Sequence, residues 1–140
     1  MTFADGTLGW LTHGQALEVF STQKGTRVAA WTFGTILRDT ATSITAVVEL
    51  PHEGNPYLAV ATTTPSSNTG LICVFDVHRC VIVKAIELPY KITALACVAG
   101  SGADQGVNQL LHNDLQTFCG ILAAGTIMGR IYLLGKALLC

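Results

Sequence analysis

The 140-residue sequence predicts an all-β fold, on three observations. Short apolar runs follow one another along the chain, with turn-forming residues between them. The runs are rich in valine, isoleucine, threonine and aromatic residues, which suit a pleated surface. No long segment has the 3.6-residue period of an amphipathic helix. The predicted strands are TLGWLTH (7–13), ALEVFS (16–21), TRVAAWTF (26–33), SITAVVEL (43–50), YLAVATT (57–63), GLICVFDV (70–77), VIVKAIEL (81–88), KITALACV (91–98), CGILAAGT (119–126) and GRIYLLG (129–135).

The apolar pattern within the strands predicts how deeply each is buried. Residues 57–63 and 70–77 are apolar on both sides, so we expect both faces of these strands to be covered. Residues 81–88 regain charge at Lys84 and Glu87, as expected of an outer strand. The run 43–50 alternates, which predicts one buried side made up of Ile44, Ala46, Val48 and Leu50.

Two internal repeats indicate how the strands are grouped. Residues 16–33 align without a gap on residues 71–88, at an offset of 55. The tetrapeptide SITA at 43–46 recurs as KITA at 91–94, at an offset of 48. These offsets lie at or just above the roughly 40–50 residues of one propeller blade. The repeats therefore favour radially stacked, four-stranded blades.

With the strands of a blade labelled a to d, the chain divides into a partial blade b-c-d (7–33), a full blade a-b-c-d (43–88) and a partial blade a-b-c (91–135). The third part contains an insertion at 99–118. Residues 1–140 are thus predicted to be one fragment of a β-propeller with WD40-like antiparallel blades and an incomplete ring.

The two repeated segments share an aromatic-polar pair at the end of strand c. Phe75-Asp76 and Phe20-Ser21 stand where WD repeats carry Trp-Asp. The aromatic residue is expected to pack between blades, and the polar residue to open the turn to strand d. His78 and Arg79 then lie in that exposed turn.

Composition and charge argue against several classes of function. Only 12% of the residues are charged, against about 25% in an average soluble domain. The formal net charge is −1, and the basic residues are scattered singly rather than clustered as a nucleic-acid binder needs. We therefore expect no direct nucleic acid contact.

The sequence also predicts a soluble intracellular chain. No apolar stretch reaches the roughly 18 residues of a spanning helix, so no transmembrane segment is expected. The start, MTFADGTLGW, lacks the basic and apolar regions of a signal peptide. The five cysteines form no CxxC pair and are interpreted as buried, reduced thiols.

Several segments together resemble a known family. FADGTLGWL, QALEVFSTQKGTRVAAWTF, GLICVFDVHRCVIVKAIELPYKITAL and LLHNDLQTFCGILAAGTIMGRIYLL are similar to the N-terminal β-propeller of the nucleoporin ELYS, and the likeness runs from about Phe3 to Leu134. Two features are more specific than a general WD40-like pattern. They are the Leu88-Pro89 turn and the Leu-His-x-x-Leu element within the insertion 99–118.

The resemblance implies a seven-bladed propeller, of which about two and a half blades are present here. It also implies a non-enzymatic scaffold that docks to the Y-subcomplex of the nuclear pore and takes part in pore assembly. Other nucleoporins are the implied partners, and the nuclear envelope and pore are the implied location in the nucleus.

No catalytic, cofactor or metal site is predicted. His78 and Cys80 could supply two zinc ligands, but structural zinc takes four and no second pair lies at usable spacing. The cysteines lie within strands, where burial makes a thiol a poor nucleophile. No GxGxxG or GxxxxGK[ST] motif occurs. The stretch TTTPSSNTG (62–70) is interpreted as a b–c hairpin loop, although its hydroxyl groups could bind phosphate.

The insertion is the one segment with an excess of length. Its second half, NQLLHNDLQ, could form a helical turn or two with Leu110, Leu111 and Leu115 on one side. Two interpretations stay open: these leucines cap the blade, or together with His112 they form a partner contact.

Alternatives to the nucleoporin scaffold also stay open. One is an unrelated WD40-like propeller adaptor in vesicle trafficking or signalling, and another is a truncated isoform with no independent function. Since an open ring leaves blade edges uncovered, the isolated chain is expected to be marginally stable and to self-associate.

Overall fold

The computed structural model describes residues 1, 3, 6–36, 42–50, 56–99 and 120–135. Within these residues the chain forms ten strands and one short helix, and no helix is long and apolar enough to cross a membrane. The elements are β1 (Leu8–His13), β2 (Ala16–Ser21), β3 (Arg27–Thr32), α1 (Phe33–Ile36), β4 (Ser43–Leu50), β5 (Tyr57–Thr63), β6 (Gly70–Asp76), β7 (Val81–Leu88), β8 (Ile92–Ala99), β9 (Gly120–Thr126) and β10 (Ile131–Leu134).

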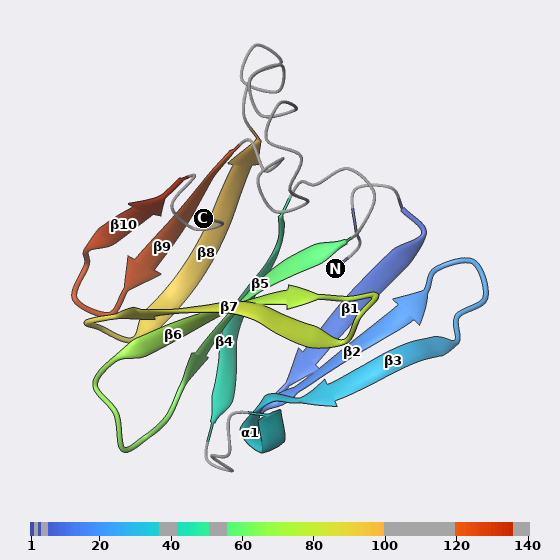
Figure 1. Ribbon diagram of the computed structural model, residues 1–140, viewed down its shortest axis with the longest axis horizontal. Coiled ribbons are helices and arrows are strands. Elements are labelled where there is room, and N and C mark those ends of the chain that lie inside the picture. The colour runs from blue at the N-terminus through green and yellow to red at the C-terminus, as the bar shows by residue number, and fades with distance from the viewer. Residues whose placement is uncertain (2, 4–5, 37–41, 51–55, 100–119, 136–140) are drawn as a thin grey trace.

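The strands form three antiparallel sheets that fan out around the middle one (Figure 1). The first sheet has the order β1-β2-β3, the second β4-β5-β6-β7 and the third β10-β9-β8. Within each sheet, strands that are consecutive in the sequence pair with one another. Between sheets, β8 packs against β4 and β5. The predicted all-β fold is confirmed, and each predicted run corresponds to one strand whose ends lie within two residues of those expected.

The second sheet is covered on both faces, as the two-sided apolar pattern of β5 and β6 predicted. On β5, Leu58 and Val60 belong to the core shared with the first sheet. Tyr57 and Ala59 alternate with them and belong to the core shared with the third sheet. The burial of both faces fixes the second sheet as the centre of the molecule.

Phe75 of β6 anchors the core between the first and second sheets. Its ring lies 4.5 Å from that of Trp31 in an edge-to-face contact and 5.7 Å from the ring of Phe33. Aromatic rings favour such tilted contacts, because the positive edge of one ring meets the negative face of the other. The aromatic residue of the Phe-Asp pair therefore packs between sheets, as predicted.

The predicted side of Ile44 is wrong. The β4–β5 ladder pairs Ile44 with Thr62 and Ala46 with Ala61, so Thr45 is an extra residue in a β-bulge. The bulge turns Ile44 to the core of the first sheet, whereas Ala46 packs against the core of the third. A period-two pattern cannot reveal this change, because one extra residue exchanges the two faces of a strand.

The same bulge recurs in the second copy of the tetrapeptide repeat. In β8, Ile92 pairs with Thr126 and Ala94 with Gly125, which leaves Thr93 as the extra residue. The hydroxyl of Thr93 donates a hydrogen bond of 3.3 Å to the carbonyl of Gly125. The hydroxyl of Thr45 donates one of the same length to Ala61. The repeated SITA/KITA motif thus encodes a bulge with a threonine that bonds across it.

The longer repeat also holds in detail. The β2–β3 ladder has a bulge at Val28, and the β6–β7 ladder has one at Val83, which is 55 residues later. The 55-residue offset of the sequence repeat therefore extends to an irregularity of the backbone.

Two features of the first sheet were not predicted. Phe33, expected at the end of a strand, begins the single-turn helix α1. In addition, the backbones of Met1 and Trp10 exchange hydrogen bonds of 2.7 and 3.0 Å, and the amide of Phe3 donates to the carbonyl of Leu8. The backbones of Met1 and Phe3 therefore lie alongside β1.

Candidate interaction surfaces

The proposed partner contact in the insertion lies outside the described residues. Leu110, Leu111, His112 and Leu115 all belong to the segment 100–119. Both of its flanks are described, since the backbones of Ala99 and Gly120 pair at the open end of the β8–β9 ladder. The segment therefore leaves the third sheet and returns to it at directly opposite residues.

The turn between β6 and β7 is held by the buried aspartate of the Phe-Asp pair. The amide of Arg79 donates a 3.0 Å hydrogen bond to Oδ1 of Asp76, and the guanidinium Nε lies 3.6 Å from Oδ2. The side chain of Asp76 is fully buried, whereas that of Arg79 is exposed. In the first sheet the amide of Lys24 makes the corresponding bond, of 3.3 Å, to the hydroxyl of Ser21. The polar residue therefore stabilises this turn in both copies of the repeat.

His78 and Cys80 lie in the same turn, and both are exposed, so the interpretation of the five cysteines as buried thiols is wrong for Cys80. The Cys80 thiol contacts the carbonyl of Val77 at 3.6 Å. In the part of the chain that the structure describes, no three His, Cys, Asp or Glu side chains lie close enough together to hold a metal ion.

Two strand cysteines are poor nucleophiles. Burial raises the pKa of the Cys73 thiol from 9.0 to about 11. Burial, helped by the Glu49 carboxylate, raises the pKa of the Cys97 thiol to about 11 as well. Near neutral pH both thiols are therefore protonated, as the interpretation of mid-strand cysteines predicted.

The outward face of the first sheet carries an ion cluster. Glu18 of β2 lies 2.8 Å from the Arg27 guanidinium and 3.4 Å from Nε2 of His13. The hydrogen bond from Arg27 lowers the pKa of the Glu18 carboxyl, with a smaller contribution from His13. This face therefore carries charge beside Glu18, together with the apolar side chain of Leu11, which pairs with Glu18 and is 55% exposed.

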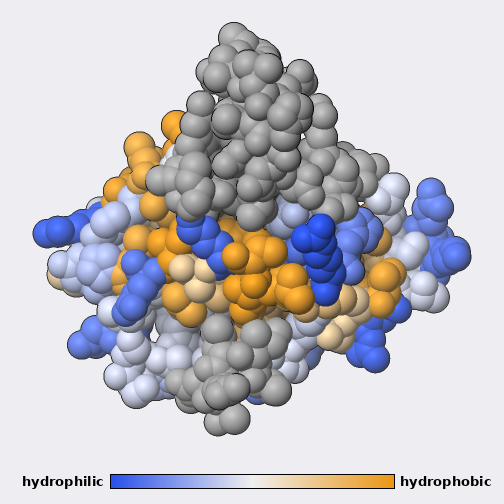
Figure 2. All heavy atoms as spheres, in the orientation of Figure 1, coloured by the Kyte–Doolittle hydropathy of each residue, from blue (hydrophilic) through white to orange (hydrophobic). Residues whose placement is uncertain are grey.

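The outward face of the third sheet is apolar. Ladder pairing places Val98 beside Ile121, and Ile131 and Leu133 beside the same side of β9. These four side chains, here called the outer face of the third sheet, are between 49% and 71% exposed. Figure 2 shows hydrophobic residues gathered at the upper left, towards the end of β10 in Figure 1. Since the opposite face of this sheet packs in the core, the third sheet is apolar on both sides.

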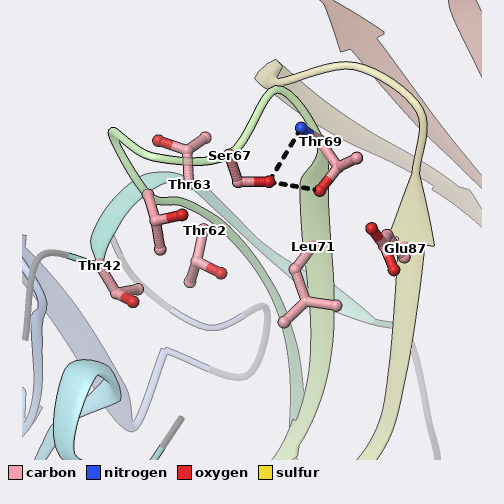
Figure 3. Close-up of a pocket in the computed structure, with 8 residues that line it drawn as sticks. Thr42, Thr62, Thr63, Ser67, Thr69, Leu71 and Glu87 are labelled. Carbon is pink, nitrogen blue, oxygen red and sulfur yellow. Dashed lines mark hydrogen bonds between the residues drawn. The ribbon is translucent and has the colours of Figure 1, made fainter. Parts of the chain in front are cut away.

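A polar hollow of about 280 Å³ lies beside the β5–β6 turn (Figure 3). It is lined by hydroxyl-bearing side chains, one leucine and one carboxylate. They are Thr42, Thr62, Thr63, Thr64, Ser67, Thr69, Leu71 and Glu87. The sequence indicated the hydroxyls of 62–70, but nothing in it indicated Thr42 or Glu87, which join the site only through the fold.

Comparison with known proteins gives one consistent result. A family model described as the beta-propeller of ELYS nucleoporin matches residues 1–140. Protein ELYS of Xenopus laevis is 28% identical over 132 residues, and Protein ELYS of Homo sapiens is 27% identical over 131 residues. Each alignment covers 94% of this chain but only 5% and 6% of those proteins. The chain thus spans a small part of the length of the relatives that it matches.

Proposed function

Because the chain belongs to the β-propeller family of the ELYS nucleoporin, we propose that it is a non-enzymatic scaffold that docks to the Y-subcomplex at the nuclear pore and takes part in pore assembly. Its place of action would be the nuclear envelope, and its partners other nucleoporins. The observation that carries this proposal is the family match over residues 1–140.

The architecture supports a scaffold role. The proposal treats residues 7–33, 43–88 and 91–135 as successive propeller blades. Packing on both faces makes the second sheet rigid, and the turns between strands are then free to carry contacts without disturbing the core.

The proposed contact within the insertion consists of Leu110, Leu111, His112 and Leu115. A partner that binds there would reach a segment fixed to the third sheet at Ala99 and Gly120. Exposed leucines at a binding surface contribute through the apolar area that they bury.

The test is capture of Y-subcomplex nucleoporins from nuclear extract by the tagged 140-residue chain, with its position in cells imaged in parallel. We expect co-purification and a nuclear-rim signal. A variant with Leu110, Leu111 and Leu115 changed to serine should lose capture, while a matched variant with Ser101, Gln105 and Asn108 changed to alanine should keep it. Capture by both variants would overturn the insertion contact. Absence of capture by the unaltered chain would overturn the docking proposal.

The proposal includes self-association of the isolated chain. The outer face of the third sheet is apolar, whereas that of the first carries the ion cluster of His13, Glu18 and Arg27. Stacking the outer face of the third sheet on the outward face of the first sheet would remove water from charged side chains and place them against apolar ones, which is unfavourable. Two copies would therefore associate through their third sheets, as a symmetric pair.

A further inference from the structure

The polar hollow is assembled from three parts of the chain. Thr62, Leu71 and Glu87 form a row across β5, β6 and β7, because the ladders pair Thr62 with Leu71 and Leu71 with Glu87. The β5–β6 turn closes one side, and Thr42, just before β4, supplies another wall. Figure 3 shows the row and the turn surrounding the space between them.

The hollow has more hydrogen-bonding capacity than it uses. Within the turn, the amide of Thr69 donates to the Ser67 hydroxyl at 3.2 Å, and the two hydroxyls share a hydrogen bond of 2.8 Å. Thr42 is only 4% exposed, and its hydroxyl has no hydrogen-bond partner among the described residues. A buried polar group without a partner is costly, so its presence in a cavity wall indicates a ligand or a water that completes it.

The charge of the hollow is negative. Glu87 is exposed, and it makes no ion pair with any of the residues that the structure describes. Among the described residues that line the hollow there is no Lys, Arg or His. A cation is therefore favoured at this position and an anion such as phosphate is repelled.

We propose that this hollow binds the side chain of a lysine presented by a protein partner. The ammonium group has three donors and no acceptor, which matches a site of hydroxyl oxygens and one carboxylate. The half-buried Leu71 gives the methylene stem of the lysine an apolar surface.

Other cations fit the lining less well. Ca²⁺ and Mg²⁺ take several oxygen ligands, usually with more than one carboxylate, and Glu87 is the one carboxylate in the described lining. A polyamine carries several charges and would leave all but one unpaired here. The hollow also opens to solvent beside a surface turn, where a partner loop can reach it.

The first experiment measures binding on the full 140-residue chain with its threonine methyl groups labelled for NMR. Five threonines line the hollow and report directly on it. Titration with N-acetyl-lysine methylamide should shift the signals of Thr42, Thr62 and Thr69 in a saturable way. The neutral analogue N-acetyl-norleucine methylamide should not shift them. Equal shifts with both probes would overturn the proposal, as would shifts spread evenly over all threonines.

Two variants test whether the binding of the lysine probe depends on the negative charge of Glu87. Glu87→Gln keeps the shape of an exposed side chain and should weaken binding of the lysine probe roughly fivefold, the upper range for a solvent-exposed ion pair. The matched control Glu18→Gln removes the same charge from the first sheet and should leave binding unchanged. Equal weakening by both variants would show a diffuse charge effect and overturn the site.

Two further experiments test the role of Thr42 in the hollow and the preference for lysine over arginine. Thr42→Val removes the unpartnered hydroxyl and should weaken binding, while unchanged methyl signals of Thr93 and Thr126 in the third sheet report an intact fold. N-acetyl-arginine methylamide should bind more weakly than the lysine probe, and tighter binding would overturn the assignment to lysine. Because the probes are small and the chain is alone, these results do not depend on docking at the nuclear pore.

Discussion

Cys80 holds the same position in the β6–β7 turn as Gly25 in the β2–β3 turn, and both have a positive φ, 57° for Cys80 and 64° for Gly25. The positions are 55 residues apart, the offset of the longer sequence repeat. Glycine adopts this left-handed conformation freely, whereas a side chain there is strained. The second turn therefore stores strain that the first does not.

Cys80→Gly should stabilise the protein. Relief of about 1 kcal/mol of strain is partly offset by the greater freedom of glycine in the unfolded chain, so we expect a gain of about 0.5 kcal/mol in the free energy of unfolding. Urea denaturation measures it. The reciprocal change, Gly25→Ala, should cost about 1 kcal/mol, because a Cβ there meets no neighbour within 4 Å and only the strain remains. Loss of stability in Cys80→Gly would contradict this account.

Asp76 should matter mainly as a hydrogen-bond acceptor. Asp76→Ala removes a buried acceptor from the Arg79 amide and should cost about 2 kcal/mol of unfolding free energy. Asp76→Asn keeps an acceptor oxygen and should cost clearly less. Thermal melts of the two variants compare them. Equal losses would show that the attraction to the exposed Arg79 guanidinium, rather than the turn bond, holds the β6–β7 connection.

Gly70 should tolerate no side chain. A Cβ on Gly70 would lie 2.7 Å from the carbonyl oxygen of Tyr90 and 2.8 Å from Cγ1 of Ile92, where the chain passes from the second sheet to the third. Gly70→Ala should therefore cost about 1–3 kcal/mol through overpacking. At Gly125, the corresponding contact with Ala94 is 3.9 Å, so Gly125→Ala should be neutral or slightly stabilising. Urea denaturation measures the unfolding free energy of both variants. A larger loss in Gly125→Ala than in Gly70→Ala would contradict the prediction.

The raised thiol pKa values predict weaker stability at high pH. The folded protein holds the thiol protons of Cys73 and Cys97 more tightly than the unfolded chain does. The stability that these protonated thiols contribute is therefore fully present below about pH 9 and is lost as the pH rises towards about 11. Alkylation with iodoacetamide, followed by peptide mass spectrometry, measures the thiols directly. At about pH 8 the exposed Cys80 should react before Cys73 and Cys97, whose rates should rise with pH. Fast alkylation of Cys73 in the folded protein would contradict its burial.

Self-association should depend on the outer face of the third sheet. Ile131 and Leu133 are 71% and 68% exposed, so changing both to threonine should leave the melting temperature nearly unchanged. Burying an aliphatic side chain contributes about 1.5–3 kcal/mol, so the dissociation constant should rise at least roughly tenfold. Analytical ultracentrifugation measures it, with Val28→Thr on the first sheet as the matched control. A wild-type chain that sediments as a sharp monomer and melts cooperatively would contradict the proposed pair.

Sequence patterns predicted the fold well where the residues themselves carry the signal. The two-sided burial of Leu58 and Tyr57 followed from an unbroken apolar run, and the packing of Phe75 followed from the repeat. The side of Ile44 did not, because the position of a bulge depends on how two strands pair. The hollow was only partly foreseen, since Thr42, Leu71 and Glu87 are far apart in the chain and meet through strand pairing. The contact at Leu110, Leu111, His112 and Leu115 stays a prediction.

The pairing of Ala99 with Gly120 has a practical consequence. Because the two ends of the intervening stretch are fixed opposite each other by a ladder, its length is nearly irrelevant to the sheet: each doubling of a flexible connection adds only about 0.6 kcal/mol to its closure. Foreign sequence, such as an epitope or a small fluorescent reporter, could be grafted between these two residues. The third sheet would then present the grafted sequence at the end of the β8–β9 ladder.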